Sequence, residues 1–161
     1  MSQPSSVDEL SSPSDFISRM RHTTAHVLAQ AIRERMPDAQ MAIGPVIDNG
    51  FFYDFQLPEQ LSEDDFPAIE ARMRQIVKAN LPLVRWSEPR EVARKRCEEL
   101  SQTFKVRLID DLPDEAEISF YQQGDFVDLC KGPHVESTGK IGAFKLMSIA
   151  GAYWRGKAEN E

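Results

Sequence analysis

The chain has 161 residues, 41% of them hydrophobic and 28% charged, which fits one compact domain. No apolar run approaches the length of a membrane span, and the polar, acidic first 15 residues lack the basic start and apolar centre of a signal peptide. The formal net charge of −7 has the wrong sign for tight, autonomous RNA binding. We therefore expect a cytoplasmic protein with no membrane partner that, by itself, binds RNA weakly.

The basic residues are unevenly placed along the chain. Ten of the nineteen Lys and Arg residues fall between Arg72 and Arg107. This distribution fits an ordinary solvated helix face better than an RNA-binding surface. The two cysteines, Cys97 and Cys130, occur without export signals, so we expect no disulfide between them.

The N-terminal third predicts a leader, a helix and a hairpin. Residues 1–14 are rich in Ser, Pro and acids and are expected to be a disordered leader. Residues 15–36 form a helical pattern that Pro37 ends, and we expect its apolar stripe to pack on a sheet. Short apolar runs at 41–47 and 51–55 flank Asp-Asn-Gly, a turn sequence typical of a β-hairpin.

The remaining elements alternate between helix and strand. Helices are predicted over residues 62–80, where Ser62 and Asp65 resemble a capping box and Pro67 lies in the first turn, and over 89–103. Strands are predicted over residues 81–86, 104–109, 118–121, 126–129 and 143–149. The pattern predicts a two-layer α+β domain over residues 15–157, with helices on one face of a mainly antiparallel sheet, followed by the start of a linker or tail at 158–161.

Two short motifs contain all three histidines of the chain. His22 and His26 are four residues apart on the first predicted helix, on the side away from its apolar stripe, so both can reach one small object. Taken alone, His22 and His26 could equally be two surface histidines without a functional role. However, Cys130 and His134 bracket a Lys-Gly-Pro turn after a predicted strand. The four side chains are of the types that zinc prefers, so the pattern indicates a metal site or a metal-free hydrolytic site.

These motifs belong to a longer resemblance. In order, the chain contains HTTAH at residues 22–26, MAIGPVIDNGFFYD at 41–54, DLCKGPH at 128–134, FKLM at 144–147 and AGAYWRG at 150–156. Together they resemble the editing domain, the second N-terminal domain, of bacterial-type threonyl-tRNA synthetases. The resemblance covers roughly residues 18–157.

The resemblance implies a proofreading hydrolase that removes serine from tRNA(Thr), with a site made of seven residues. His22 and Lys105 would be catalytic. His26, Cys130 and His134 would form the substrate pocket with them, and Tyr53 and Asp128 would bind or orient the substrate. Its partners would be the 3′ end of tRNA(Thr) carrying serine and the aminoacylation and anticodon-binding domains of the synthetase.

The chemistry explains why such a site is needed. Serine lacks one methyl group of threonine, and a missing methylene supplies only about 1–3 kcal/mol of discrimination. Hydrolysis of the wrong ester needs a positioned water, a base for its proton and donors facing the oxyanion. A histidine suits the base, and the Lys105 ammonium would stabilise the oxyanion or, with a lowered pKa, act as the base itself. Cys130 resembles a substrate-ordering residue more than a covalent nucleophile.

Three features depart from the family pattern. The small ubiquitin-like domain that usually comes first is missing, the chain stops at Glu161, and Thr23 stands where the family often has serine. We therefore expect either a fragment or a reduced, free-standing editing protein.

Two alternatives remain open. One is a free-standing, zinc-dependent hydrolase of mischarged alanyl-tRNA, because the related alanyl-tRNA editing domains hold zinc with a similar set of histidines and cysteine. The other is a non-catalytic module that binds zinc or RNA. We expect no bound metal; zinc, if bound, would be held by His22, His26, Cys130 and His134.

Overall fold

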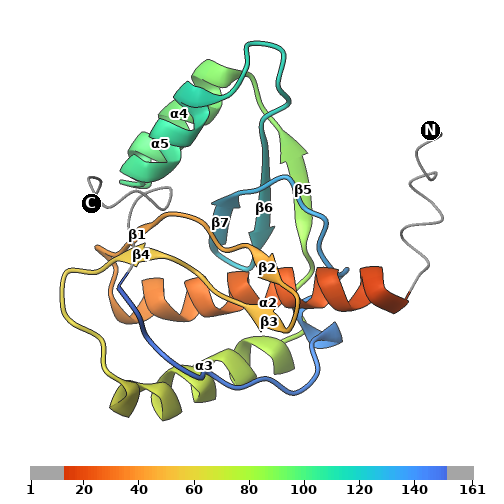
Figure 1. Ribbon diagram of the computed structural model, residues 1–161. Helices are drawn as coiled ribbons and strands as arrows, with labels where there is room; N and C mark the ends of the chain where they lie inside the picture. The colour runs from red at the N-terminus through yellow and green to blue at the C-terminus, as the bar shows by residue number, and fades with distance from the viewer. Residues whose placement is uncertain (1–12, 152–161) are drawn as a thin grey trace.

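The computed structural model describes residues 13–151, and the long helix α2, Pro13–Arg35, runs through its centre (Figure 1). The predicted helix is confirmed, but its stripe packs mainly on another helix rather than on a sheet. Val27, Ala31 and Ile32 form a core with the next helix, α3, Phe66–Lys78. Among the strands of the described residues, only the two short ones that carry Phe51 and Phe55 are seen to contact this core. The reason is that the apolar face of α3, from Ile69 to Ile76, covers the stripe. The opposite side of α2, which carries His22 and His26, is left to face other segments.

The predicted hairpin is confirmed as two short antiparallel pairs beside α2. Strand β1, Gln40–Met41, pairs with β4, Phe55–Gln56, and β2, Val46–Ile47, pairs with β3, Gly50–Phe51. Gly44 lies against the ring of Tyr53, where an added Cβ would come within 2.3 Å of the ring. A side chain at this position would therefore displace Tyr53.

Helix α3 follows a short 3-10 turn, η1, Glu63–Asp65. The Ser62 backbone N–H donates to the Asp65 carboxylate at 2.9 Å, as the sequence pattern predicts, and Pro67 lies in the first turn of α3.

A three-stranded antiparallel sheet stands above α2. Its strand order is β5, Val84–Ser87, then β6, Ser119–Gln123, then β7, Phe126–Leu129. One face packs Phe120 against α4, Arg90–Glu99, and α5, Thr103–Asp111. The opposite face turns toward α2: Gln123 Nε2 donates to Gln30 Oε1 at 2.8 Å, and Phe126 packs on Ala25 and Ala29. The α+β class is thus confirmed, and α2 lies across the second face of the sheet.

Two predicted strands are wrong. Residues 104–109 lie in helix α5, because their buried residues recur at helical spacing: Phe104 and Lys105 are followed by Ile109. A turn at Ser101, with a φ of 58°, separates α5 from α4. Residues 143–149 form no strand. This segment is instead hydrogen-bonded to α3, where the Leu146 N–H donates to Glu70 Oε1 at 3.1 Å.

Two other boundaries shift. The strand predicted over 81–86 begins at Val84, since Pro82 has no N–H to pair and forms only an isolated bridge with Ser137. A 3-10 turn, η2, Thr138–Lys140, follows that bridge. The last two residues of the expected leader begin α2, while its first twelve and the tail at 158–161 lie outside the described residues. Between residues 13 and 151, no helix is long and apolar enough to cross a membrane.

Candidate active site

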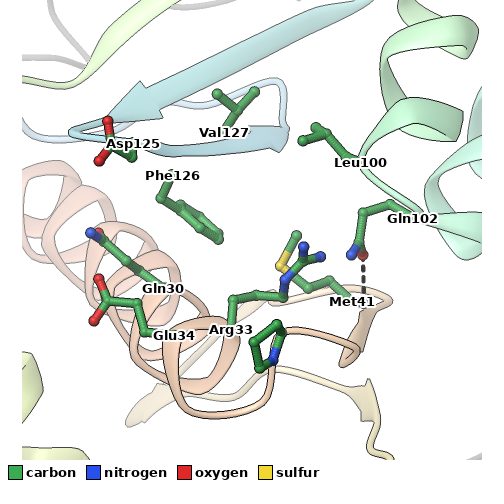
Figure 2. Close-up of a pocket in the computed structure, with 10 residues that line it drawn as sticks. Gln30, Arg33, Glu34, Met41, Leu100, Gln102, Asp125, Phe126 and Val127 are labelled. Carbon is green, nitrogen blue, oxygen red and sulfur yellow. Dashed lines mark hydrogen bonds between the residues drawn. The ribbon is translucent and has the colours of Figure 1, made fainter.

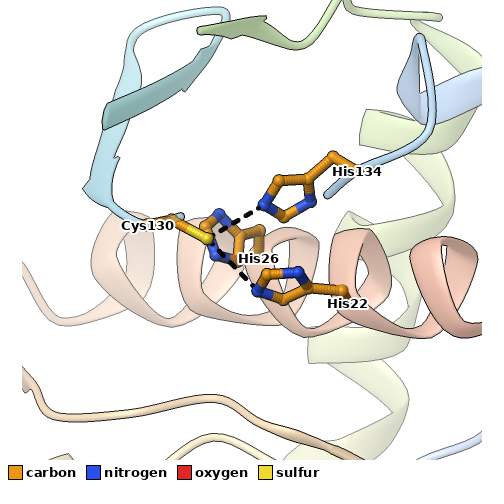
Figure 3. A group of neighbouring side chains, drawn as sticks. All are labelled: His22, His26, Cys130 and His134. Carbon is orange, nitrogen blue, oxygen red and sulfur yellow. Dashed lines mark hydrogen bonds between the residues drawn. The ribbon is translucent and has the colours of Figure 1, made fainter. Parts of the chain in front are cut away.

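The two sequence motifs meet in space. His22 and His26 rise from α2, and Cys130 and His134 reach down from the segment after β7 (Figure 3). Cys130 Sγ lies 3.2 Å from His22 Nε2 and 3.3 Å from His134 Nε2. The His22 and His134 rings stack with their centroids 4.0 Å apart. One polar atom from each of the four residues lies within 4.8 Å of the others.

The end of the sheet positions Cys130. Its backbone N–H donates to the Ser119 carbonyl at 3.0 Å, and the Ser119 hydroxyl donates to the Cys130 carbonyl at 2.6 Å. Gly132 then turns the chain back with a φ of +82°, and an added Cβ there would meet Tyr121 Oη at 2.3 Å. Glycine is required at this position on both counts.

The hydrogen bonds of His22 define its proton position. Its Nδ1 lies 3.0 Å from the Pro133 carbonyl, and because a carbonyl only accepts, Nδ1 carries the proton. Burial lowers the pKa of His22 below its ordinary value of 6.5, which favours the neutral ring with a lone pair on Nε2. Burial also raises the pKa of the Cys130 thiol to about 12. The pair is therefore a neutral imidazole beside a protonated thiol, which is a poor nucleophile.

His26 is buried, with an exposed fraction of 3%. Its Nε2 lies 3.5 Å from Asp128 Oδ2, and burial, followed by the charges of His22 and Lys105, holds its pKa well below 6.5. Its Nδ1 has no hydrogen-bond partner among the described residues. A buried polar atom without a partner costs stability unless a ligand or a water completes it.

A second group lies beside His26. The Tyr53 hydroxyl donates to Asp128 Oδ2 at 2.6 Å, and Lys105 Nζ lies 3.1 Å from Asp128 Oδ1 and donates to the Tyr53 oxygen at 3.0 Å. All three side chains are buried. Burial, then the charge of Asp128, raises the pKa of Tyr53 well above 10.0, so Tyr53 stays a donor. The group fixes one ammonium next to the histidine cluster.

The side chain of Gln102 sets the position of Lys105. Gln102 Oε1 accepts from the Met41 N–H at 2.8 Å, and its Nε2 donates to the Ala39 carbonyl at 3.2 Å. Figure 2 shows the first of these bonds. These bonds attach the start of α5 to β1 and place Lys105, in the first turn, toward Tyr53.

The structure brings together all seven predicted residues and adds two that the sequence reasoning did not select. Tyr121 packs edge-on against His134, with ring centroids 4.3 Å apart. The Thr23 hydroxyl lies 2.9 Å from His134 Nδ1. Tyr121 is paired with Asp128 in the sheet register, so strand alternation places both on one face and could have identified Tyr121.

A separate cavity of about 200 Å³ lies at the C-terminal half of α2 (Figure 2). Its walls include Arg33, Met41 and Phe126 and none of the seven predicted site residues. The Gln30 and Gln102 amides that line it are already hydrogen-bonded within the protein. We therefore place the candidate site at the histidine cluster.

The donor set fits zinc. In a tetrahedral site with bonds of about 2.0–2.3 Å, ligand atoms are about 3.5 Å apart, close to the Sγ to Nε2 separations of 3.2 and 3.3 Å seen here. His22, His26, Cys130 and His134 would hold the ion, and a bound zinc would supply Lewis acidity and lower the pKa of a bound water.

Half of the clustered basic residues are paired on the surface. Six of the ten between Arg72 and Arg107 form salt bridges to Glu or Asp: Lys105 forms the buried one described above, and the other five are Arg72, Arg74, Arg85, Arg94 and Arg96. Of the five surface residues, Arg72 and Arg74 lie on α3 and Arg94 and Arg96 on α4, as expected for a solvated helix face, whereas Arg85 lies on strand β5.

The buried imidazoles predict a loss of stability in acid. Burial lowers the pKa of His22, His26 and His134 in the folded state. Below pH 6.5 the unfolded chain therefore binds protons that the folded chain does not bind. The free energy of unfolding has its full value above pH 6.5 and decreases as the pH falls below it. The buried His26 by itself accounts for a decrease in the free energy of unfolding of up to about 1.4 kcal/mol per pH unit. Urea unfolding between pH 7.5 and 5.0 with a chelator measures this, and a constant midpoint across that range would contradict the buried neutral rings.

The class of domain is given by comparison with known families. Residues 118–161 match the family model described as the threonyl and alanyl tRNA synthetase second additional domain. This segment of the chain belongs to that family, and it includes Asp128, Cys130 and His134.

Full-length relatives narrow the class to one branch. The chain is 57% identical over 141 residues to the threonine–tRNA ligase of Acetivibrio thermocellus, covering 88% of this chain and 22% of that protein. It is 50% identical over 147 residues to the Marinobacter nauticus ligase, covering 91% and 23%. It is also 54% identical over 142 residues to the Clostridium acetobutylicum ligase, covering 88% and 22%. The chain is thus homologous to a segment of bacterial threonine–tRNA ligases and spans about a fifth of their length.

Proposed function

We propose that this chain is an editing hydrolase that deacylates seryl-tRNA(Thr), with residues 15–157 as the editing domain. The proposal rests on two observations: Tyr53 and Asp128 hold the buried Lys105 ammonium beside the histidine cluster, and in that cluster His22 carries its proton on Nδ1 and a lone pair on Nε2. This arrangement supplies a base for water and a fixed positive charge for an oxyanion, as ester hydrolysis requires.

In the proposed reaction, a water attacks the carbonyl carbon of the seryl ester. His22 Nε2 accepts a proton from the water as its oxygen forms the new bond, and Lys105 stabilises the negative charge on the carbonyl oxygen. The ester C–O bond then breaks, and the ribose oxygen takes up the proton that His22 accepted, which leaves free serine, a tRNA with an intact 3′-terminal adenosine and a neutral His22. Cys130 forms no covalent bond in this scheme, which agrees with its raised pKa.

The remaining residues would bind the substrate. His26 Nδ1, buried without a partner among the described residues, can complete its hydrogen bonding with the serine hydroxyl or amino group. His134 packs against the rings of His22 and Tyr121, and rings held in this way would suit steric rejection of the extra methyl of threonine. Steric rejection of this kind is the second step of a double-sieve mechanism.

We propose that the physiological setting is a threonyl-tRNA synthetase in the cytoplasm. Its other domains would aminoacylate tRNA(Thr) and bind the anticodon, and they would supply most of the tRNA affinity. The net charge of −7 on this chain supports that division.

The test is hydrolysis of seryl- and threonyl-tRNA(Thr) by the purified chain, with and without a chelator. We expect the seryl ester to be cleaved selectively, with full activity in the chelator. The assay should include high protein concentrations to offset weak tRNA binding. Equal cleavage of both esters, or none at any concentration, would contradict the proposal.

One further candidate function is supported by the zinc-like donor set, namely a zinc-dependent hydrolase of mischarged alanyl-tRNA. Stoichiometric zinc and loss of activity on chelation would favour it. A purely structural zinc module predicts instead that His26→Ala and His134→Ala unfold the domain. Under the editing proposal these variants stay folded without metal.

A further inference from the structure

Thr23 lies between the two histidines of the first motif and is fully buried. Its hydroxyl oxygen lies 2.9 Å from the Arg19 carbonyl, 3.1 Å from the Val135 backbone nitrogen and 2.9 Å from His134 Nδ1. The residue therefore connects α2 to the segment that carries His134. None of the roles assigned above uses it.

The three contacts determine where the protons lie. The Arg19 carbonyl only accepts and the Val135 N–H only donates, whereas a hydroxyl has one proton and two lone pairs. The Thr23 proton is therefore directed to Arg19, and its oxygen accepts from Val135. The remaining lone pair faces His134 Nδ1, a contact that is attractive only when Nδ1 carries a proton. A hydroxyl proton directed at Nδ1 would instead leave the Thr23 and Arg19 oxygens 2.9 Å apart with no proton between them.

This proton position affects the thiol. Neutral His134 with its proton on Nδ1 presents a lone pair on Nε2 to Cys130 Sγ, 3.3 Å away. The single thiol proton then has two acceptors, His134 Nε2 and His22 Nε2. If His134 were protonated on Nε2, that proton would point at the sulfur. The thiol could then donate only to His22, and the lone pair of His22 would be occupied.

We propose that Thr23 is a positioning residue: it fixes His134 in the tautomer protonated on Nδ1, so that the Cys130 thiol can donate to His134 and His22 Nε2 can accept the proton of the attacking water. The inference rests on the proposed hydrolysis for its kinetic consequence. The tautomer itself is a property of the folded chain and is measured without substrate. Serine at this position would make the same three contacts, because it retains the hydroxyl.

Thr23→Val removes the hydroxyl at nearly constant volume. A proton on His134 Nδ1 would then be buried with no acceptor, whereas a proton on Nε2 would still have the Cys130 sulfur. We expect the variant to change to the Nε2–H tautomer. We also expect kcat for seryl-tRNA(Thr) to fall about tenfold or more, with KM within about twofold, because the base is occupied while the binding surface is unchanged.

The experiment combines imidazole ¹H–¹⁵N correlation spectra of the chelator-treated domain at pH 7.5 with kinetics on seryl-tRNA(Thr). The wild type and Thr23→Ser should show His134 protonated on Nδ1 and equal kcat, and Thr23→Val should differ in both. The matched control is Thr24→Val: Thr24 is also buried and donates to the Met20 carbonyl at 2.7 Å, but no contact to an imidazole is found for its hydroxyl among the described residues. Thr24→Val should leave the tautomer and kcat unchanged.

An Nε2–H tautomer in the wild type would overturn the inference. So would an unchanged kcat in Thr23→Val, or an equal loss in Thr24→Val, which would indicate general damage to α2. If the wild-type domain hydrolyses no seryl ester, the proposed function fails, and the spectra of wild type, Thr23→Val and Thr24→Val alone decide the inference.

Discussion

Lys105→Met should lower kcat for serine removal by roughly 10²–10³ and also destabilise the domain by about 3–5 kcal/mol. The activity falls because the only buried ammonium found beside the histidine cluster in the described structure is lost, and one oxyanion-stabilising group accounts for roughly 10²–10³ in kcat. The stability falls because the Asp128 carboxylate stays buried without its cation. Single-turnover deacylation and urea unfolding measure the two effects separately.

A double variant separates the two roles of Lys105. In Lys105→Met/Asp128→Asn the buried charge is removed together with its partner, so much of the lost stability should return. Activity should not return, since no cation faces the ester. Lys95→Met, which removes an exposed lysine from α4, is the control and should change neither quantity. A Lys105→Met variant with wild-type deacylation would remove Lys105 from the mechanism.

His22→Ala should lower kcat by roughly 10²–10⁴ while the domain stays folded. His22 Nε2 is the proposed proton acceptor, and its ring is only partly buried, so its removal leaves no buried charge. Deacylation rates at pH 7.5, with circular dichroism as a check on folding, measure the change.

Cys130→Ala provides the contrast to His22→Ala. Because the thiol is protonated at neutral pH, with a pKa raised to about 12, its loss should lower kcat much less than the loss of His22. Iodoacetamide at pH 7.5 should likewise inactivate the wild type slowly. If Cys130→Ala were as inactive as His22→Ala and a seryl-enzyme adduct accumulated in the wild type, a covalent mechanism would replace the water attack proposed here.

The spacing of residues along the chain already determined much of the candidate site. Histidines four apart share one helix face whatever the helix packs against, and alternation in β6 and β7 places Asp128 and Tyr121 on one face of any sheet those strands form. The helix α2, the hairpin and the β6–β7 pair follow from such local periodicity, and the structure confirms them.

Packing between distant segments decided the rest. The run from Phe104 to Ile109 is too short for its apolar pattern to separate helix from strand, and the bonds of Gln102 to Ala39 and Met41, more than sixty residues away, place Lys105 on a helix. The stripe of α2 packs on α3 because that helix offers a matching apolar face. The contact of Thr23 with His134 joins residues 111 positions apart. Local sequence thus determined which side chains share a face, and only tertiary contacts determined which faces meet and where the protons between them lie.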